Sequence, residues 1–454
     1  MRKNSMGEKE MQDRLFSDRQ LIKLMIPLVI EQGLTILVGM CDGVMVSAVS
    51  EAAISGVSLV DMINAVILVL FAALATGGAV VTSQMLGARR TADARRSAGQ
   101  LVSLTFAMGC LMMALCQIFA RGLLKLFFGS IADDVMAAGL IYLRITALSF
   151  PFIALYNAGA AIFRSVGNSK VSMQVSLWMN GINVAGNALC VFVLKMGVAG
   201  VAVPTLVSRA VAAVMILTMA SRKGQELTLD ASSLYPIDRQ VMGKILRIGI
   251  PSACENSFFQ FGRLLVVSMI ALFGTTQTSA NAVANNLDSV GTVVGQAMGL
   301  AMVTVVGQSV GAGDKEQATF YLKKVMKWSI VALGAVNLMI ILFLNPLIGL
   351  YRSLTPQTVE LTRTLVLIHS TAVIFMWAFS FVLPNAFRAA NDVQFTMWVG
   401  MGSMLVFRVG VSWILCVRLG WGAVGVWIAM ILDWVCRISF FLPRALTGKW
   451  LSKI

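Results

Sequence analysis

Apolar residues fill this chain in long continuous runs that short polar stretches separate. Each run extends over about 20 residues or more and lacks the alternation of apolar and polar positions typical of a β-strand. Hydrocarbon cannot hydrogen-bond a peptide backbone, so runs of this length predict membrane-spanning helices. We expect spans near 21–47, 54–80, 97–121, 138–160, 171–194, 198–220, 245–271, 279–306, 323–346, 359–386, 395–417 and 421–445.

The composition agrees with this pattern, because 58% of the residues are hydrophobic, 13% are charged, and the mean hydropathy is +0.82. A net charge of +15 could suggest a nucleic-acid partner. The lysines and arginines gather in alternate loops, however, and this is the positive-inside distribution of membrane proteins. We therefore expect a multi-pass protein of the plasma (cell inner) membrane with both termini cytoplasmic, contacts with anionic membrane lipid, and no nucleic-acid partner.

The chain also repeats itself. Pro251 and Glu255 repeat Pro27 and Glu31 at an offset of 251 − 27 = 224. The same offset relates further pairs, namely Gln84 and Gln308, Gly87 and Gly311, Ala94 and Ala318, Phe163 and Phe387, and Arg164 and Arg388. Six spans per repeat is an even number, so both halves enter the membrane from the same side. The expected fold is an all-α integral membrane protein with twelve transmembrane helices in two pseudo-symmetric six-helix lobes.

The longest polar connection divides these lobes. The expected order is a cytoplasmic N-terminal segment (1–20), an N-terminal lobe (21–220), a cytoplasmic linker (221–243), a C-terminal lobe (244–445) and a cytoplasmic tail (446–454). In a parallel repeat the transport site is expected between the lobes.

Two carboxylates interrupt the first predicted span. Glu31 lies near mid-depth, and Asp42 follows 42 − 31 = 11 residues later, close to three helical turns. Both therefore share one stripe that cannot face lipid, because a charge at the centre of a span costs about 2.5–3.5 kcal/mol. One interpretation is a pair of neutral or ion-paired structural acids. The other is a proton or cation relay that faces a wet cavity.

Glu255 copies Glu31 in the second half and is followed by Asn256. This duplication predicts a matched pair of glutamates on facing walls of one substrate and proton cavity. Asp288 and His369 are further candidates for that cavity. Asp288 could instead form a structural pair with Arg263, and a lone histidine is more often a satisfied core residue than a proton carrier.

Asn183 and Asn187 share one face of the fifth predicted span, because they are spaced i, i+4. Thr205 follows in the sixth span. Carboxylate, amide and hydroxyl oxygens are the ligands that a hard cation prefers. Hydrogen bonding between helices is an equally good interpretation of the same side chains.

Other chemistries lack their signatures in this sequence. The seven cysteines all lie inside apolar runs without a CxxC pattern, which indicates reduced, buried thiols. No Walker A motif is present, and neither a nucleophile–histidine–acid array nor a metal-ligand array suggests catalysis. We expect no enzyme activity and no cofactor.

Several segments resemble the multidrug and toxic compound extrusion (MATE) family over roughly 21–441. They are Pro27 with Asp42 in MCDGVMVS, VVGQSVGAGDKEQA at 305–318 with its weaker copy VVTSQMLGARRTADA at 80–94, AIFRSVGNS at 161–169, NAFRAANDV at 385–393, and GVAGVAVPT at 197–205. The resemblance implies two lobes in a V-shaped arrangement, alternating access, and export of organic cations driven by inward flow of protons or sodium ions.

The resemblance also assigns residues. Asp42 matches the family's first-span aspartate, and Asn183 and Thr205 match positions of a cation site, so a sodium ion at these three residues is the metal site it implies. Glu255 matches the seventh-span glutamate of one branch. Asn187 stands where one branch has a second aspartate, which weakens a sodium site there, and the choice between H+ and Na+ stays open.

The leading hypothesis is therefore a secondary active multidrug exporter, expected to be a monomer, that antiports small amphipathic or cationic organic compounds against H+ or Na+. One alternative is a lipid-linked precursor flippase of the same superfamily. Another is a non-coupled membrane channel or a scaffold.

Overall fold

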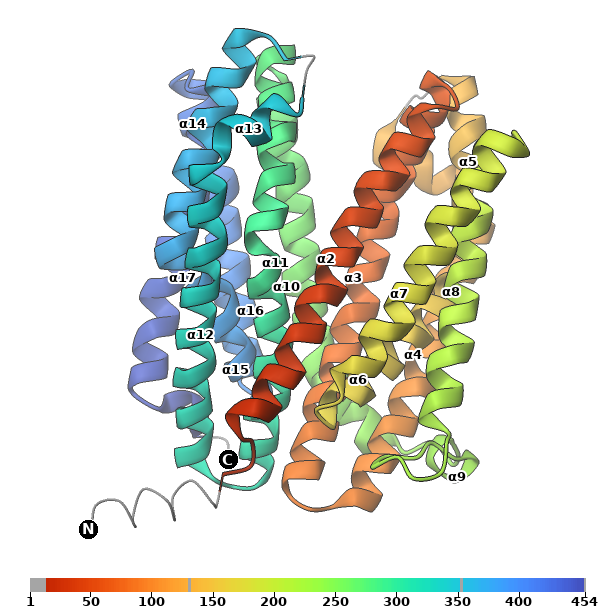
Figure 1. The fold of residues 1–454 in the computed structure, drawn as a ribbon, viewed down its shortest axis with the longest axis vertical. Helices are drawn as coiled ribbons and strands as arrows, with labels where there is room; N and C mark the ends of the chain where they lie inside the picture. The colour runs from red at the N-terminus through yellow and green to blue at the C-terminus, as the bar shows by residue number, and fades with distance from the viewer. Residues whose placement is uncertain (1–13, 130–131, 352–353, 453–454) are drawn as a thin grey trace. The chain divides into compact units, whose positions relative to one another are not determined.

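The computed structural model describes residues 14–129, 132–351 and 354–452, and this part of the chain is helical (Figure 1). The first helices are α2 (Asp18–Ser47), α3 (Glu51–Gly87), α4 (Thr91–Phe128), α5 (Asp133–Leu148), α6 (Phe150–Ser165), α7 (Ser169–Ala188), η1 (Leu189–Val193), α8 (Ala199–Ala220), α9 (Ala231–Leu234) and α10 (Arg239–Ala271). The later ones are α11 (Thr275–Gly311), α12 (Lys315–Leu342), α13 (Leu344–Gly349), α14 (Pro356–Ala372), η2 (Val373–Val382), α15 (Leu383–Ala389), α16 (Val393–Ser403), η3 (Met404–Val411), η4 (Trp413–Arg418), α17 (Gly422–Leu446) and η5 (Lys449–Leu451).

Each of the twelve predicted spans coincides with a helical stretch. Ten such stretches in the described residues are long and apolar enough to cross a membrane, and the bent pair α5 and α6 forms an eleventh. The remaining predicted span is α10, where Glu255, Asn256 and Arg263 dilute the apolar run. The all-helical, multi-span prediction is therefore confirmed. Of the predicted N-terminal segment, residues 1–13 lie outside the described part.

The predicted span 138–160 is not one straight helix. The chain bends by 45° between α5 and α6. Ser149 joins the two helices, and its hydroxyl donates to the carbonyl of Thr146 at 2.6 Å. Pro151 stands in the first turn of α6, where its missing N–H leaves no hydrogen bond unmade. A proline that follows a break is a local signal for this bend.

Three predicted spans contain π-helical turns. They occur in η1 after α7, in η2 between α14 and α15, and in η3 and η4 after α16. A π-turn adds one residue to a helical turn and shifts the faces on either side of it relative to each other. Apolar periodicity does not signal such a shift, so the simple α-helices expected at these places need this correction.

The described chain forms two compact units. Unit 2 consists of Ile30–Thr82 and Thr91–Ser257, and unit 1 contains the other described residues, including Ser83–Arg90 and the chain from Phe258 onward. Each of α2, α3 and α10 contributes residues to both units. The predicted lobe limits stay a prediction.

Unit 1 is organised around α11, which packs against α12, α14 and α15. Its C-terminal end crosses the last turn of α3 at unusually close range. A Cβ atom at Gly87 would overlap the carbonyl oxygen of Gln308, and a Cβ atom at Gly311 would overlap that of Gln84. Only glycine lets two helix backbones approach this closely. The crossing therefore joins two glycines and two glutamines that the 224-residue offset relates to each other.

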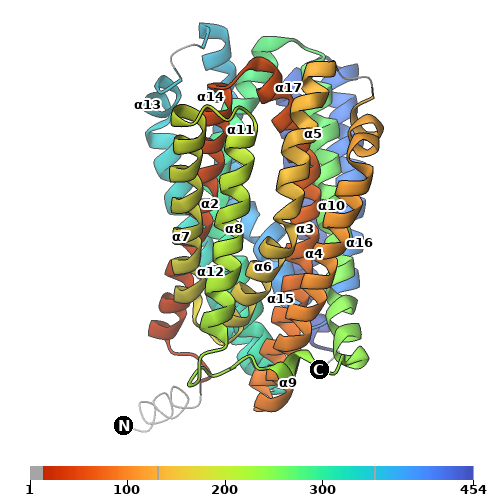
Figure 2. The same cartoon turned by 90° about the vertical axis from the view of Figure 1, so that its right-hand side faces the viewer.

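Within unit 2, part of the predicted linker packs on α4. The buried side chain of Gln100 donates to the carbonyls of Ser233, Leu234 and Pro236, each at 3.2 Å, and accepts from the backbone N–H of Asp238 at 2.9 Å. Figure 2 shows α9 beside the N-terminal part of α4. One amide side chain thus satisfies four backbone groups of the linker, which makes this part of it a packed segment.

Candidate ion-coupling site

A chain of hydrogen bonds in unit 2 joins three of the predicted site residues to the Asp42 carboxylate. The side-chain nitrogen of Asn187 donates to Oδ1 of Asp42 at 2.7 Å and lies 3.3 Å from Oδ1 of Asn183. Asn183 in turn donates to the hydroxyl of Thr205 at 3.0 Å, and Thr205 donates to the carbonyl of Val201. Helices α2, α7 and α8 therefore bring together the four residues that the sequence singled out.

The amides in this chain are shielded from solvent. Asn187 has no exposed surface and Asn183 has 6%, whereas Asp42 is partly buried. Oδ1 of Asn187 is buried without a hydrogen-bond partner among the described residues. A buried amide oxygen usually has a partner, because leaving it unpaired costs about 1–3 kcal/mol. The site therefore holds one acceptor that a bound cation could satisfy.

Three more charged or polar groups surround Asp42. Asp61 and Arg209 lie within electrostatic range of its carboxylate. The hydroxyl of Tyr142 hydrogen-bonds to Asp61, and Arg209 donates to the hydroxyl of Ser149 at 2.9 Å. Tyr142 could not be predicted as a neighbour of this site, because a single tyrosine in an apolar run carries no signal in the sequence.

The residues of this site limit which ions it can bind. The described residues contain no group of three or more His, Cys, Asp and Glu side chains that could hold a metal ion. The site offers one hydrogen-bonded carboxylate with neutral amide and hydroxyl oxygens. That combination suits a proton or one monovalent hard cation better than a tightly held divalent ion.

Glu31 lies in a separate cluster of unit 2. Its side chain is 4% exposed, and its carboxylate accepts from the hydroxyls of Ser172 at 2.7 Å and Tyr156 at 3.2 Å. Arg164 completes the cluster with an ion pair at 3.4 Å. Sequence reasoning missed these three partners, although Arg164 was among the residues that the repeat preserves.

Glu255 is also buried, with 6% exposure, and the neighbouring Asn256 is exposed. Both belong to unit 2, as Glu31 does. A shared cavity between Glu31 and Glu255 stays a prediction.

Asp288 and His369 meet in unit 1. Nε2 of His369 lies 2.8 Å from Oδ1 of Asp288, and the histidine is 2% exposed. The rings of Trp427 and Trp434 pack against the imidazole edge to face, with centroids 5.4 and 5.3 Å away. The histidine is thus both a packed core residue and the partner of a carboxylate, and Arg263 forms no ion pair with Asp288 in the described structure.

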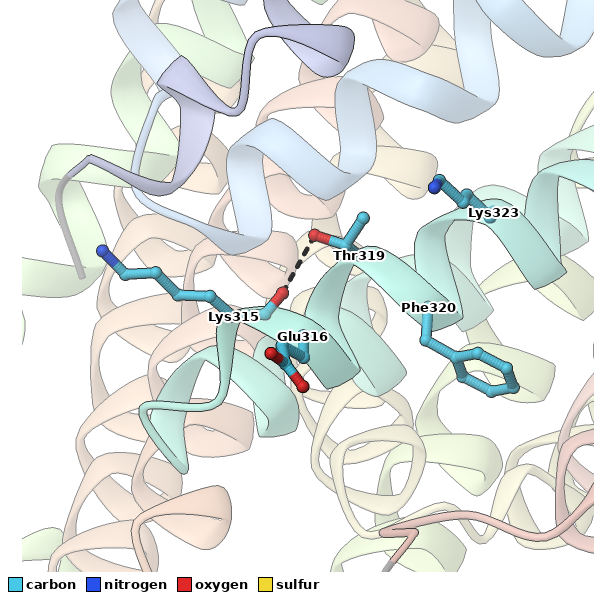
Figure 3. Close-up of a pocket in the computed structure, with 5 residues that line it drawn as sticks. All are labelled: Lys315, Glu316, Thr319, Phe320 and Lys323. Carbon is cyan, nitrogen blue, oxygen red and sulfur yellow. Dashed lines mark hydrogen bonds between the residues drawn. The ribbon is translucent and has the colours of Figure 1, made fainter. Parts of the chain in front are cut away.

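A hollow on the surface of α12 contains none of these residues. It is lined by Lys315, Glu316, Thr319, Phe320 and Lys323 (Figure 3). The hydroxyl of Thr319 is bonded to the carbonyl of Lys315 at 2.9 Å, so this group is already satisfied within the helix. The hollow therefore adds nothing to the polar clusters described above.

Comparison with known proteins agrees with this architecture. The family model MatE matches residues 27–189 and again 251–414, and its two starting points differ by 251 − 27 = 224 residues, the offset found in the sequence. The probable multidrug resistance protein NorM of Thermotoga maritima is 28% identical over 439 residues, which cover 95% of this chain and 93% of that protein. The uncharacterized transporter YisQ of Bacillus subtilis is 27% identical over 450 residues, which cover 97% of this chain and 95% of that protein.

Solved structures share the fold. A multidrug resistance MATE family transporter in an outward-facing conformation has a TM-score of 0.89 at 21% identity, with 96% of each chain covered. A MATE structure in the bent conformation has a TM-score of 0.85 at 22% identity, again over 96% of each chain. Because the family model matches both halves of the sequence, the chain belongs to the MatE family of multi-pass membrane transporters, which are not enzymes.

Proposed function

We propose that the protein is a cation-coupled exporter of small amphipathic organic cations, with Asp42 as the residue that takes up the coupling ion. The observation that carries this proposal is the chain from Asp42 through Asn187 and Asn183 to Thr205, with its unpartnered amide oxygen. The multidrug names of distant relatives such as NorM support the substrate class.

The proposed coupling step uses the carboxylate of Asp42. A proton or sodium ion that binds there neutralises its charge and competes with Asn187 for Oδ1. Either event changes the hydrogen bonds that link α2 to α7 and α8. A change in helix contacts that depends on ion occupancy is what alternating access requires, because an ion can shift an equilibrium only through its differential affinity for two states.

The decisive experiment is transport by the purified protein in proteoliposomes. A proton gradient or a sodium gradient is imposed separately, and uptake of a fluorescent organic cation is compared with that of a neutral analogue. Saturable uptake that one of the two gradients drives supports antiport and identifies the ion. Uptake that neither gradient changes, or an ionic current that does not saturate, would favour a channel and contradict the proposal.

We also propose that both termini face the cytoplasm, because lysines and arginines concentrate in alternate loops. In a background without native cysteines, Asp134→Cys should react with a membrane-impermeant maleimide added to whole cells. Lys315→Cys should react only after the membrane is opened. The reverse pattern would invert the orientation.

A further inference from the structure

Unit 1 contains a small cavity with two arginines in its lining. Polar or aromatic residues of the lining are Arg263, Arg408, Asn281, Asn285 and Trp427, and the rest of the lining is apolar (Val266, Val267, Val426 and Met430). The cavity measures about 20 Å³. That is close to the space that one water molecule needs, so it admits a single small group and not a drug-sized molecule.

The two arginines face this cavity without an acidic partner. Among the residues that the structure describes, neither Arg263 nor Arg408 forms an ion pair or donates a hydrogen bond, and Nε of Arg408 is buried and unbonded. The guanidinium of Arg408 lies over the ring of Phe259, 5.8 Å from its centroid. Asp288 and Asp433 lie within electrostatic range of Arg408. Their ion pairs are formed with other residues, Asp288 with His369 at 2.8 Å and Asp433 with Arg437 at 3.2 Å.

Charge balance in this region is therefore incomplete. Three arginines (263, 408 and 437) stand against two aspartates (288 and 433), which leaves a formal charge of 3 − 2 = +1 while His369 is neutral. Arg263 is exposed and Arg408 is half-buried, with its Nε shielded from solvent and unbonded. A partly buried guanidinium without a hydrogen-bond partner is unfavourable, and its donors form short, strong hydrogen bonds with anionic groups when these are available. A bound anion would satisfy both requirements.

The other wall of the cavity adds a neutral donor. The indole N–H of Trp427 donates to Oδ1 of Asn281 at 2.9 Å. This bond fixes the orientation of the Asn281 amide, and it leaves the amide nitrogen as the group that Asn281 can offer to a ligand. Two guanidinium groups and one amide N–H form a donor set without a competing carboxylate.

The internal repeat provides a second, independent observation. Helices α2 and α10 end at Ser47 and Ala271, and α3 and α11 begin at Glu51 and Thr275, so the offset of 224 holds in this region. It pairs Asp42 with Val266, which also lines the cavity.

The offset likewise pairs Asp61 with Asn285, a second residue of the cavity lining, and it pairs Gly39 with Arg263. The place that holds two acids in one half thus has neutral side chains and an added arginine in the other. Arg209, which lies near Asp42, is paired with Asp433, which lies near Arg408. The equivalent regions of the two repeats therefore carry different sets of charges.

We propose that Arg263 and Arg408 form a binding site for one small anionic group, either a free halide or a carboxylate. Binding is an equilibrium property of the folded chain, so this proposal does not depend on the transport activity proposed above.

The test is thermal unfolding of the purified full-length protein in detergent. Sodium chloride or sodium formate replaces sodium gluconate stepwise, so that the sodium concentration and the ionic strength stay constant. A ligand that binds only the folded state raises the midpoint by an amount that grows with the logarithm of its concentration above the dissociation constant. We expect chloride, formate, or both to raise the midpoint above its value in the large gluconate ion. The comparison of chloride with formate distinguishes a halide site from a carboxylate site.

Variants locate the effect. Arg408→Gln and Arg263→Gln should each weaken the apparent affinity by about tenfold or more, whereas Arg408→Lys, which keeps the charge, should weaken it less. Arg418→Gln is the matched control, because Arg418 belongs to the same span, Val393–Arg418, but its guanidinium lies over the ring of Trp413, 4.6 Å from the centroid. It should keep the full response.

Two results would overturn the proposal. The first is an equal midpoint of the unaltered protein in all three anions, which needs no variant to be informative. The second is a chloride or formate response that is undiminished in Arg263→Gln, Arg408→Gln and Arg408→Lys alike. If the glutamine variants do not fold, the anion selectivity of the unaltered protein together with Arg408→Lys still decides the question.

Discussion

The polar interiors of the two units differ in chemistry although the same repeat builds both. In unit 2, Asp42 and Asp61 lie among amides and hydroxyls. In unit 1, the corresponding positions are Val266 and Asn285, and two arginines line the cavity there. Pro27 and Pro251 are kept at equivalent positions, whereas the polar side chains of the two sites differ.

The difference shows how a duplicated scaffold can acquire two binding chemistries. Fold and site are set by different residues, because helix packing depends on apolar and small side chains while binding depends on a few polar ones. A charge inside a membrane protein is costly without a partner or a ligand. The acidic set of unit 2 and the basic set of unit 1 are therefore the places where ligand chemistry is expected to differ.

The largest effect is expected at the acidic site. Asp42→Asn removes the only carboxylate in the hydrogen-bond chain of Asn187, Asn183 and Thr205, so gradient-driven efflux should fall to the background of empty vesicles. Uptake into proteoliposomes measures this. Asp134→Asn, which changes an exposed acid in the first turn of α5, should leave transport intact. Undiminished efflux by Asp42→Asn at a saturating gradient would exclude Asp42 from coupling.

The next largest effect is a loss of stability at the crossing of α3 and α11, to which the two repeats contribute equivalent residues. Gly87→Ala and Gly311→Ala should each lower the free energy of unfolding by about 3 kcal/mol, because each new Cβ overlaps a backbone carbonyl that cannot move away. Denaturation in detergent measures the loss. Gly402→Ala has open space around it and should not destabilise the protein. Strongly unequal losses at the two positions would contradict an equivalent role in the two repeats.

At the cavity of unit 1, a smaller change in the free energy of unfolding is expected, in the stabilising direction. Val266→Asp places a carboxylate beside Arg263 and Arg408, at the position that holds Asp42 in the other repeat. In chloride-free buffer its free energy of unfolding should exceed that of the neutral control Val266→Asn by about 1 kcal/mol, because the arginines compensate the new charge, and it should abolish stabilisation by added anions. Val266→Asn should keep the response to anions. An anion response that persists in Val266→Asp would place the bound anion elsewhere.

The smallest effect concerns the duplicated glutamates. Glu31→Gln and Glu255→Gln should each lower the initial rate of cation export by about threefold, equivalent to about 0.6 kcal/mol, and should change export of a neutral analogue less. If the two act on one site, the double variant should lose less than the product of the single losses. Independent losses that are equal for neutral compounds would make both glutamates structural acids, as the contacts of Glu31 with Arg164 and Ser172 also allow.

The sequence was sufficient for the helices because long apolar runs have only one stable form in a bilayer. It also singled out Asp42, Asn183 and Thr205, since polar side chains inside such runs are costly unless they have a partner or bind a ligand. Their contacts could not be predicted, because hydrogen bonds between helices depend on rotation and depth, which π-turns alter locally. Arg164 shows the same limit, since its place in the repeat was visible but its contact with Glu31 was not.

The crossing of Gly87 with Gln308 and of Gly311 with Gln84 has the form of an isologous contact. In a symmetric dimer, residue i of one subunit contacts residue j of the other, and j contacts i in return. Here the two partners are related by the 224-residue offset within one chain. This is the contact that two identical half-length subunits would make across a twofold axis, so the crossing has the form expected of a homodimer whose single gene was duplicated and fused.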